Sequence, residues 1–362
     1  MPHSKQLENL PFLPPGKEYQ GNLVRNTSEM TERLSLAIPE EILEPELRII
    51  DAHHHLMDSH RSNIHYLLDN FSADLSVGHN IYATVFVDSH AMYRPDGPKD
   101  LQVIGEVEFA RDVASMASSA PYSGCKVAEA IVGGIDLRIN SIERVLEAAI
   151  QAGDGRYCGV RHSATFHDSI IGDFIPYPAP RQLLGSSDFR RGYSCLEKYH
   201  LSFDAWVFHS QLEELIELID LFPNVPVALN HIGAPLGVGP YSGRHSEVFS
   251  EWSMAMQRLS KRENVSVKIG GMGMPLFGFD FHSRKVPPHS TELASAWQPY
   301  VETCIDLFGS ERCMFESNFP MDKQSYGYAE CWNAFKRLTV NYTKTERNNL
   351  FFLTASNFYK IK

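Results

Sequence analysis

Three consecutive histidines early in the chain are the residues best suited to chemistry. The sequence I-I-D-A-H-H-H occupies positions 49–55, so a β-favouring apolar pair runs into an acid and then into the histidines. Alternate side chains share a face on a β-strand, and His53 and His55 are therefore expected to point the same way while His54 points the other way. Two imidazoles on one face at the end of a buried strand suit the binding of a metal ion or the polarisation of a carbonyl group.

The elements that must position these histidines form a repeating pattern from residue 46 onward. Short β-rich runs end in polar residues, and helical patterns follow them, which predicts a parallel sheet covered by helices. Eight such units favour an α/β fold, a distorted (β/α)8 TIM barrel over residues 46–362. An open doubly wound sheet is the alternative, but it would carry a glycine-rich fingerprint where the histidines stand. The expected strands span 47–53, 81–88, 130–136, 158–162, 203–208, 226–230, 265–269 and 313–317. The expected helices span 60–69, 110–118, 141–152, 210–222, 247–262, 291–308, 330–338 and 343–352.

Residues 1–45 differ in composition and are expected to form an N-terminal arm. The proline-rich stretch 11–16 suits neither a helix nor a central strand. Apolar residues between Leu34 and Leu43 could cover a groove on the barrel, and a disordered tail is the competing interpretation.

Composition and charge narrow the class of protein. The net charge of −11 argues against a nucleic-acid partner and against an anionic membrane surface, because both would require a basic patch. No apolar run approaches the ~20 residues of a membrane span, and the first 20 residues lack a signal-peptide pattern. The six cysteines are scattered without a C-x-x-C pair, as in reduced proteins. We therefore expect a cytoplasmic globular protein with a small-molecule substrate.

The ends of the predicted strands carry groups that ionise or coordinate. In a (β/α)8 barrel these carboxyl ends meet at one face, where active sites lie. So regular a series is hard to obtain from packing alone and predicts a functional site. The groups are His53, His55, Asp88, His90, Asp136, Arg161, His162, His209, Asn230, His231, Lys268 and Asn318.

Six short motifs lie in order between residues 48 and 325. They are I-D-A-H-H-H at 50–55, G-V-R-H at 159–162, W-V-F-H-S-Q-L at 206–212, L-N-H-I-G-A-P at 229–235, V-K-I-G-G at 267–271 and M-F-E-S-N-F-P at 314–320. In this order and spacing the chain resembles the amidohydrolase superfamily. More narrowly, it resembles the amidohydrolase-related branch that includes sugar-lactone and pyrone-dicarboxylate lactonases.

The resemblance implies a hydrolase, most simply a lactonase, and roles for particular residues. His53, His55 and His231 would bind one divalent metal ion, Zn²⁺ in the first place, which lowers the pKa of its bound water toward ~7. In metal-free catalysis, described for some lactonases of the branch, the histidines and Arg161 would polarise the carbonyl directly. The resemblance also suggests a homodimer.

The chain departs from the family pattern at the eighth strand. The family typically has an aspartate where this chain has Asn318, and an amide cannot accept a proton at neutral pH. Asn318 could still orient water, and the base would then be His209, which we favour, or Asp322, Asp88 or Glu316. Glu316 is expected to face away from the barrel centre. The missing aspartate keeps two alternatives open: a decarboxylase or hydratase on the same barrel, and a non-catalytic ligand-binding barrel.

Four further residues are predicted to contact substrate. His162 ends the fourth strand, Tyr93 follows the second strand, and Arg244 follows a glycine-rich loop that could cover the site mouth. Lys268 is expected to pair with a carboxylate, in the site or in the barrel interior; its place on the seventh strand disfavours a binuclear metal centre. The long segments 165–182 and 272–288 carry aromatics that would suit the wall of an apolar or aromatic substrate site.

Overall fold

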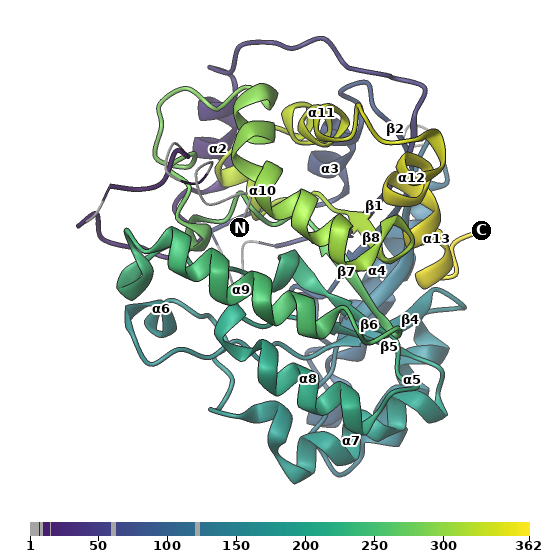
Figure 1. The fold of residues 1–362 in the computed structure, drawn as a ribbon. Coiled ribbons are helices and arrows are strands. Elements are labelled where there is room, and N and C mark those ends of the chain that lie inside the picture. Colours follow the sequence, from purple (N-terminus) through teal and green to yellow (C-terminus); the bar gives the residue numbers. More distant parts are fainter. Residues whose placement is uncertain (1–6, 8–9, 15, 59–62, 120–123) are drawn as a thin grey trace.

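The computed structural model describes residue 7 and residues 10–14, 16–58, 63–119 and 124–362 (Figure 1). Eight parallel strands pair in sequence order, β1 with β2 through to β7 with β8. This order confirms the (β/α)8 barrel and rules out the doubly wound sheet, whose strand order would reverse at a switch point. The strands are β1 Arg48–His54, β2 Asn80–Val87, β3 Lys126–Gly134, β4 Tyr157–Arg161, β5 Ser202–Ala205, β6 Val227–Leu229, β7 Val265–Ile269 and β8 Cys313–Phe315.

Backbone hydrogen bonds connect the last strand segment to the first. The N–H of Asn318 donates to the carbonyl of His53 at 2.9 Å, and the N–H of His55 donates to the carbonyl of Phe319 at 2.7 Å. The histidine segment is therefore held on both sides, by β2 and by the residues after β8.

Helices cover the outside of the sheet, and Figure 1 shows α8, α9 and α10 side by side along it. Each presents an apolar stripe to the strands, as Leu212, Leu215 and Ile219 do in α8. The helices are α2 Thr27–Leu34, α3 Leu68–Leu75, α4 Ile104–Ala117, α5 Ile142–Ala152, α6 Ile170–Asp173, α7 Ser187–Lys198, α8 Leu212–Leu221, α9 His245–Leu259, α10 Ser290–Phe308, α11 Tyr328–Leu338, α12 Lys344–Asn348 and α13 Thr354–Phe358.

One predicted helix is wrong, and one observed helix was not predicted. The expected helix 60–69 is wrong where the structure describes it: Tyr66 exchanges backbone hydrogen bonds with Met57 at 2.7 and 2.8 Å, which holds that segment extended, and α3 begins only at Leu68. Residues 60–62 of that prediction lie outside the described residues. Helix α7 was not expected, although its buried residues Phe189 and Tyr193 stand at helical spacing.

The barrel interior is divided between an apolar layer and a buried ion pair. Small and branched side chains of β1, β2 and β3 fill the apolar layer. The ion pair joins Lys268 and Asp204 at 2.6 Å. Tyr359, which follows α13, donates its hydroxyl to the same Asp204 carboxylate at 3.0 Å. Lys268 therefore lies in the barrel interior, one of the two positions expected for it.

The N-terminal arm packs along the barrel. Helix α2 is drawn in purple at the upper left of Figure 1. Arg33 of α2 is buried and donates hydrogen bonds to four backbone carbonyls from two distant segments. These carbonyls belong to Phe281, Arg284, Gln324 and Ser325. Within the described part of the chain, no helix has the length and apolarity to cross a membrane.

Candidate active site

The two site histidines reach the barrel mouth because β1 changes face just before them. Ala52 packs in the inner apolar layer, yet His53 and His55 also turn inward. The pairing of β1 with β2 is irregular between Asp51 and His54, and the Asp51 carboxylate accepts a hydrogen bond from the N–H of His53 at 3.3 Å. This local irregularity places both imidazoles over the end of the barrel, with their Nε2 atoms 3.2 Å apart.

His54 points to the opposite side, as strand alternation predicts. Its ring stacks on Phe71 of α3 at a centroid distance of 4.2 Å, and Nε2 lies 2.9 Å from the Thr84 hydroxyl. His54 is thus a packing residue between the sheet and a helix.

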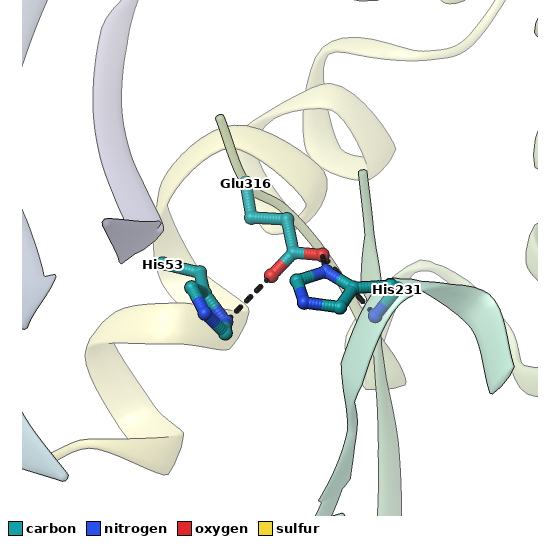
Figure 2. Close-up of side chains that lie close together, drawn as sticks. All are labelled: His53, His231 and Glu316. Carbon is teal, nitrogen blue, oxygen red and sulfur yellow. Dashed lines mark hydrogen bonds and ion pairs between the residues drawn. The ribbon is translucent and has the colours of Figure 1, made fainter. Parts of the chain in front are cut away.

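Glu316 lies between two histidines and completes a buried cluster (Figure 2). One carboxylate oxygen lies 3.0 Å from Nδ1 of His53, and the other lies 2.6 Å from Nδ1 of His231. The backbone N–H of His231 also donates to Glu316, at 3.2 Å. The expectation that Glu316 faces away from the barrel centre is therefore wrong. Met314 of β8 packs in the inner layer, and strand alternation from it would have indicated that residue 316 points the same way.

Burial controls the protonation of this cluster. Burial, followed by the nearby positive charges, holds the pKa of His53, His55 and His231 well below the usual value, so the imidazoles are neutral. Burial raises the pKa of Glu316 to about 8, and the charge of Lys268 opposes this rise. Neutral imidazoles are the form that binds metal ions.

Arg161 brings a positive charge to the edge of the cluster. Its guanidinium Nε donates to the Asp88 carboxylate at 2.5 Å, and a second nitrogen donates to the Asp88 backbone carbonyl. Another nitrogen lies 3.4 Å from Nε2 of His53. Burial raises the pKa of Asp88, but the Arg161 charge, the nearby His90 and the hydrogen bond from Arg161 together hold that pKa below its ordinary value. Asp88 is thereby kept ionised and fixes the guanidinium in place.

A cavity of about 340 Å³ opens above these groups. Six of the predicted strand-end groups line it: His55, Asp88, His90, Arg161, His231 and Asn318. A volume of this size suits a small molecule. His53 and Glu316 lie behind this surface, fully buried.

Asn318 lines the cavity and carries an amide oxygen without a hydrogen-bond partner. Its Nδ2 donates to the Asp322 carboxylate at 2.8 Å, whereas Oδ1 is buried and has no partner. Asp322 also accepts hydrogen bonds from the N–H of Gly273 at 2.8 Å and from the hydroxyl of Tyr326. Asp322 does not line the cavity, so its place is behind Asn318, where it fixes the orientation of the amide.

His209, the favoured candidate for the base, does not line the cavity. Strand β5 ends at Ala205, three residues earlier than expected, and His209 begins a short 3-10 helix. Its Nδ1 accepts a hydrogen bond from the N–H of Leu236 at 3.3 Å. From the same segment Trp206 enters the cavity instead and packs edge-on against His231 at 4.7 Å. Sequence reasoning missed Trp206, although it stands in the matched motif at 206–212.

All four predicted substrate contacts, His162, Tyr93, Arg244 and Lys268, lie outside the lining of the cavity. His162 accepts a hydrogen bond from the N–H of Leu137 at 3.2 Å, so it belongs to the packing behind β4. Arg244 is exposed and pairs with Glu247 three residues on. The hydroxyl of Tyr93 lies 3.1 Å from Nδ1 of His90, which itself lines the cavity; Tyr93 therefore stands behind the rim.

Comparison with known proteins places this chain in one family. The amidohydrolase family model matches residues 50–361. An uncharacterised protein of Sinorhizobium fredii, y4mH, is 30% identical over 336 residues, which cover 87% of this chain and 99% of the relative. An L-fucono-1,5-lactonase of Burkholderia ambifaria is 24% identical over 293 residues, covering 75% of this chain and 87% of the relative.

Solved structures share the fold. An amidohydrolase of Burkholderia multivorans with bound zinc has a TM-score of 0.66 at 20% identity, covering 87% of this chain and 100% of that one. A 5-carboxyvanillate decarboxylase of Novosphingobium aromaticivorans, complexed with manganese, has a TM-score of 0.52 at 12% identity, covering 88% of this chain and 97% of that one.

Proposed function

Because this chain belongs to the amidohydrolase family, we propose that it is a hydrolase that opens a lactone or a related ester of a small organic acid. The observation that carries the proposal is the buried cluster of His53, His231 and Glu316 beneath a cavity that also exposes Arg161. Such a site can polarise a carbonyl group and stabilise the negative charge that develops on its oxygen. The likeness to the L-fucono-1,5-lactonase supports a lactone as the substrate.

The cluster fits a divalent metal ion. Its ligand atoms lie within 4.8 Å of one another, and two neutral imidazoles with one carboxylate form a donor set that zinc accepts. The carboxylate oxygen of Glu316 that faces His53 has no hydrogen bond. A bound ion would activate the carbonyl or the attacking water. Burial raises the pKa of Glu316 to about 8, so at neutral pH Glu316 would give up its proton on binding an ion and would then supply the anionic ligand that a histidine-only site lacks.

The side chains around the cavity have distinct roles in this proposal. Arg161 binds the developing oxyanion or a substrate carboxylate through the guanidinium nitrogen that does not contact Asp88. Asn318 accepts a hydrogen bond from the attacking water or a substrate hydroxyl through Oδ1, because its nitrogen is occupied by Asp322.

His55 is the proposed proton acceptor. Its Nδ1 lies 2.9 Å from the carbonyl of Val87, an acceptor, so Nδ1 carries the hydrogen and Nε2 keeps its lone pair. Water attacks the carbonyl carbon and gives a proton to His55 Nε2. The ring C–O bond then breaks, and the departing oxygen takes that proton to give a hydroxy acid.

Decarboxylation on the same barrel is the second candidate, and the amide at position 318 favours it. A hydrolase of the expected pattern would have a carboxylate there, whereas this chain offers a group that cannot take a proton. Product mass after incubation with lactones and with aromatic carboxylates separates the two. Gain of one water molecule supports the hydrolase, and loss of CO₂ without hydration overturns it.

A further inference from the structure

The N-terminal arm supplies part of the cavity wall. Residues 20–23 line the cavity, although they precede the segment 50–361 that the family model matches. The wall they form lies outside the segment that the family model matches. Because this wall lines the same cavity as Arg161 and His231, it is a candidate for selecting substrates.

The arm is fixed closely enough to act as a wall. Asn22 accepts hydrogen bonds from the hydroxyl of Tyr19 at 3.1 Å and from the N–H of Leu276 at 3.3 Å. Gly21 has a φ of +87°, and a Cβ at that position would lie 3.0 Å from the ring of Phe174. The buried ring of Tyr19 also packs edge-on against Phe174 at 5.3 Å. The arm and the loop that carries Phe174 thus form one packed unit over the mouth.

Apolar side chains provide most of the exposed cavity surface, although polar side chains of the arm and the loops, among them Gln20, Asn22, Ser163 and Thr165, also line it. Charged and coordinating groups gather at the base, on the strand ends. Apolar side chains face them from the arm, from the loop after α6 and from the β5 segment. They include Leu23, Phe174, Ile175, Tyr177, Trp206 and Met274. Hydroxyl groups held against Leu23 and Phe174 would lose their water without gaining partners, which disfavours a polyhydroxylated substrate body at that part of the cavity.

We propose that the arm is a specificity element, and that the site takes an organic acid or lactone with an apolar body held against Leu23 and Phe174. This inference rests on the proposed function, because it takes the cavity as the substrate site. It sets this chain apart from an enzyme for sugar lactones, whose substrates carry several hydroxyl groups.

Binding of two carboxylates, measured by calorimetry on the full chain, tests the proposal without relying on turnover. The probes are 3-phenylpropionate, which has an apolar body, and gluconate, which is polyhydroxylated. Wild type should bind 3-phenylpropionate at least about tenfold more tightly than gluconate. Leu23→Ala should weaken 3-phenylpropionate about fivefold to tenfold and leave gluconate unchanged, because it removes only apolar contact.

Leu36→Ala is the matched control: the same change in the arm, at an exposed residue that does not line the cavity. It should alter neither affinity. Circular dichroism checks that both variants are folded. If Leu23→Ala does not fold, Phe174→Ala replaces it, because Phe174 belongs to the same apolar part of the cavity lining. The proposal is overturned if wild type binds gluconate as tightly as 3-phenylpropionate or binds neither, or if the wall variant changes both affinities equally. Selective binding without lactone hydrolysis would overturn the proposed reaction and support the role of the arm.

Discussion

The carboxylate of Glu316 lies 2.6 Å from Nδ1 of His231 and accepts a hydrogen bond from the backbone N–H of the same residue. This double contact joins the segment after β8 to the segment after β6 at the centre of the barrel mouth. Among the described residues, Glu316 is the only carboxylate in the group of side chains that could hold a metal ion.

Replacing Glu316 by glutamine should weaken binding of a divalent ion by at least about tenfold, because the amide keeps the shape of the carboxylate but loses its charge. Isothermal titration with Zn²⁺ and Mn²⁺ measures the change. Glu330→Gln is the matched control, since Glu330 is a largely buried carboxylate on α11 outside the cluster. Equal affinities for Glu316→Gln and wild type would exclude Glu316 as a ligand.

Alanine substitutions of the neighbouring residues His53 and His54 should have different effects, the first on activity and the second on stability. His53→Ala should reduce kcat/KM by about a thousandfold or more while the fold persists, because it removes a group at the reacting centre. His54→Ala should instead lower Tm by several degrees, since it deletes a ring packed on Phe71, and should keep most of the activity. Kinetics and thermal unfolding of both variants provide the measurement. Near wild-type turnover in His53→Ala would contradict the site.

The sequence predicts the barrel well because alternation of strands and helices is a repeated, local signal. It also predicts that the paired histidines share a face. It misplaces His209, because the expected strand runs past Ala205, where β5 ends, and one short 3-10 turn redirects the side chain. The sequence gives the wrong side for Glu316, because it does not show which residues of the eighth strand face the barrel interior. Once Met314 is known to face inward, strand alternation indicates that Glu316 does so too. The arm's contact with the cavity depends on packing between residues about 150 positions apart, Gly21 and Phe174, which no local pattern encodes.

The pH dependence of stability should report the buried Asp322. Burial raises its pKa to about 7, and Glu316 adds to that rise, while hydrogen bonds from Tyr326, Gly273 and Asn318 oppose it. A carboxyl whose pKa is raised by folding stabilises the protein below its unfolded pKa, and that contribution is lost as the pH rises toward the folded pKa. Between about pH 4 and pH 7, wild type should therefore lose up to about 1.4 kcal/mol per pH unit relative to Asp322→Asn.

Denaturant unfolding of wild type and Asp322→Asn at several pH values between 4 and 7 measures this difference. Asp220→Asn is the control, because its hydrogen bond from Arg262 lowers the pKa of Asp220 and places its titration below this window. A difference between wild type and Asp322→Asn that does not change with pH would show that Asp322 is ionised throughout.

Arg161 should be sensitive even to a change that keeps its charge. Its guanidinium contacts both the carboxylate and the carbonyl of Asp88, which leaves one edge directed toward His53 and the cavity. Lysine cannot make these contacts together, so Arg161→Lys should lower kcat/KM about a hundredfold while Tm changes little. Arg138→Lys is the matched control, because Arg138 makes a comparable two-nitrogen contact with Asp136 outside the cavity. Equal kcat/KM for the two lysine variants would mean that Arg161 serves only to hold Asp88, and that the oxyanion is stabilised by other groups.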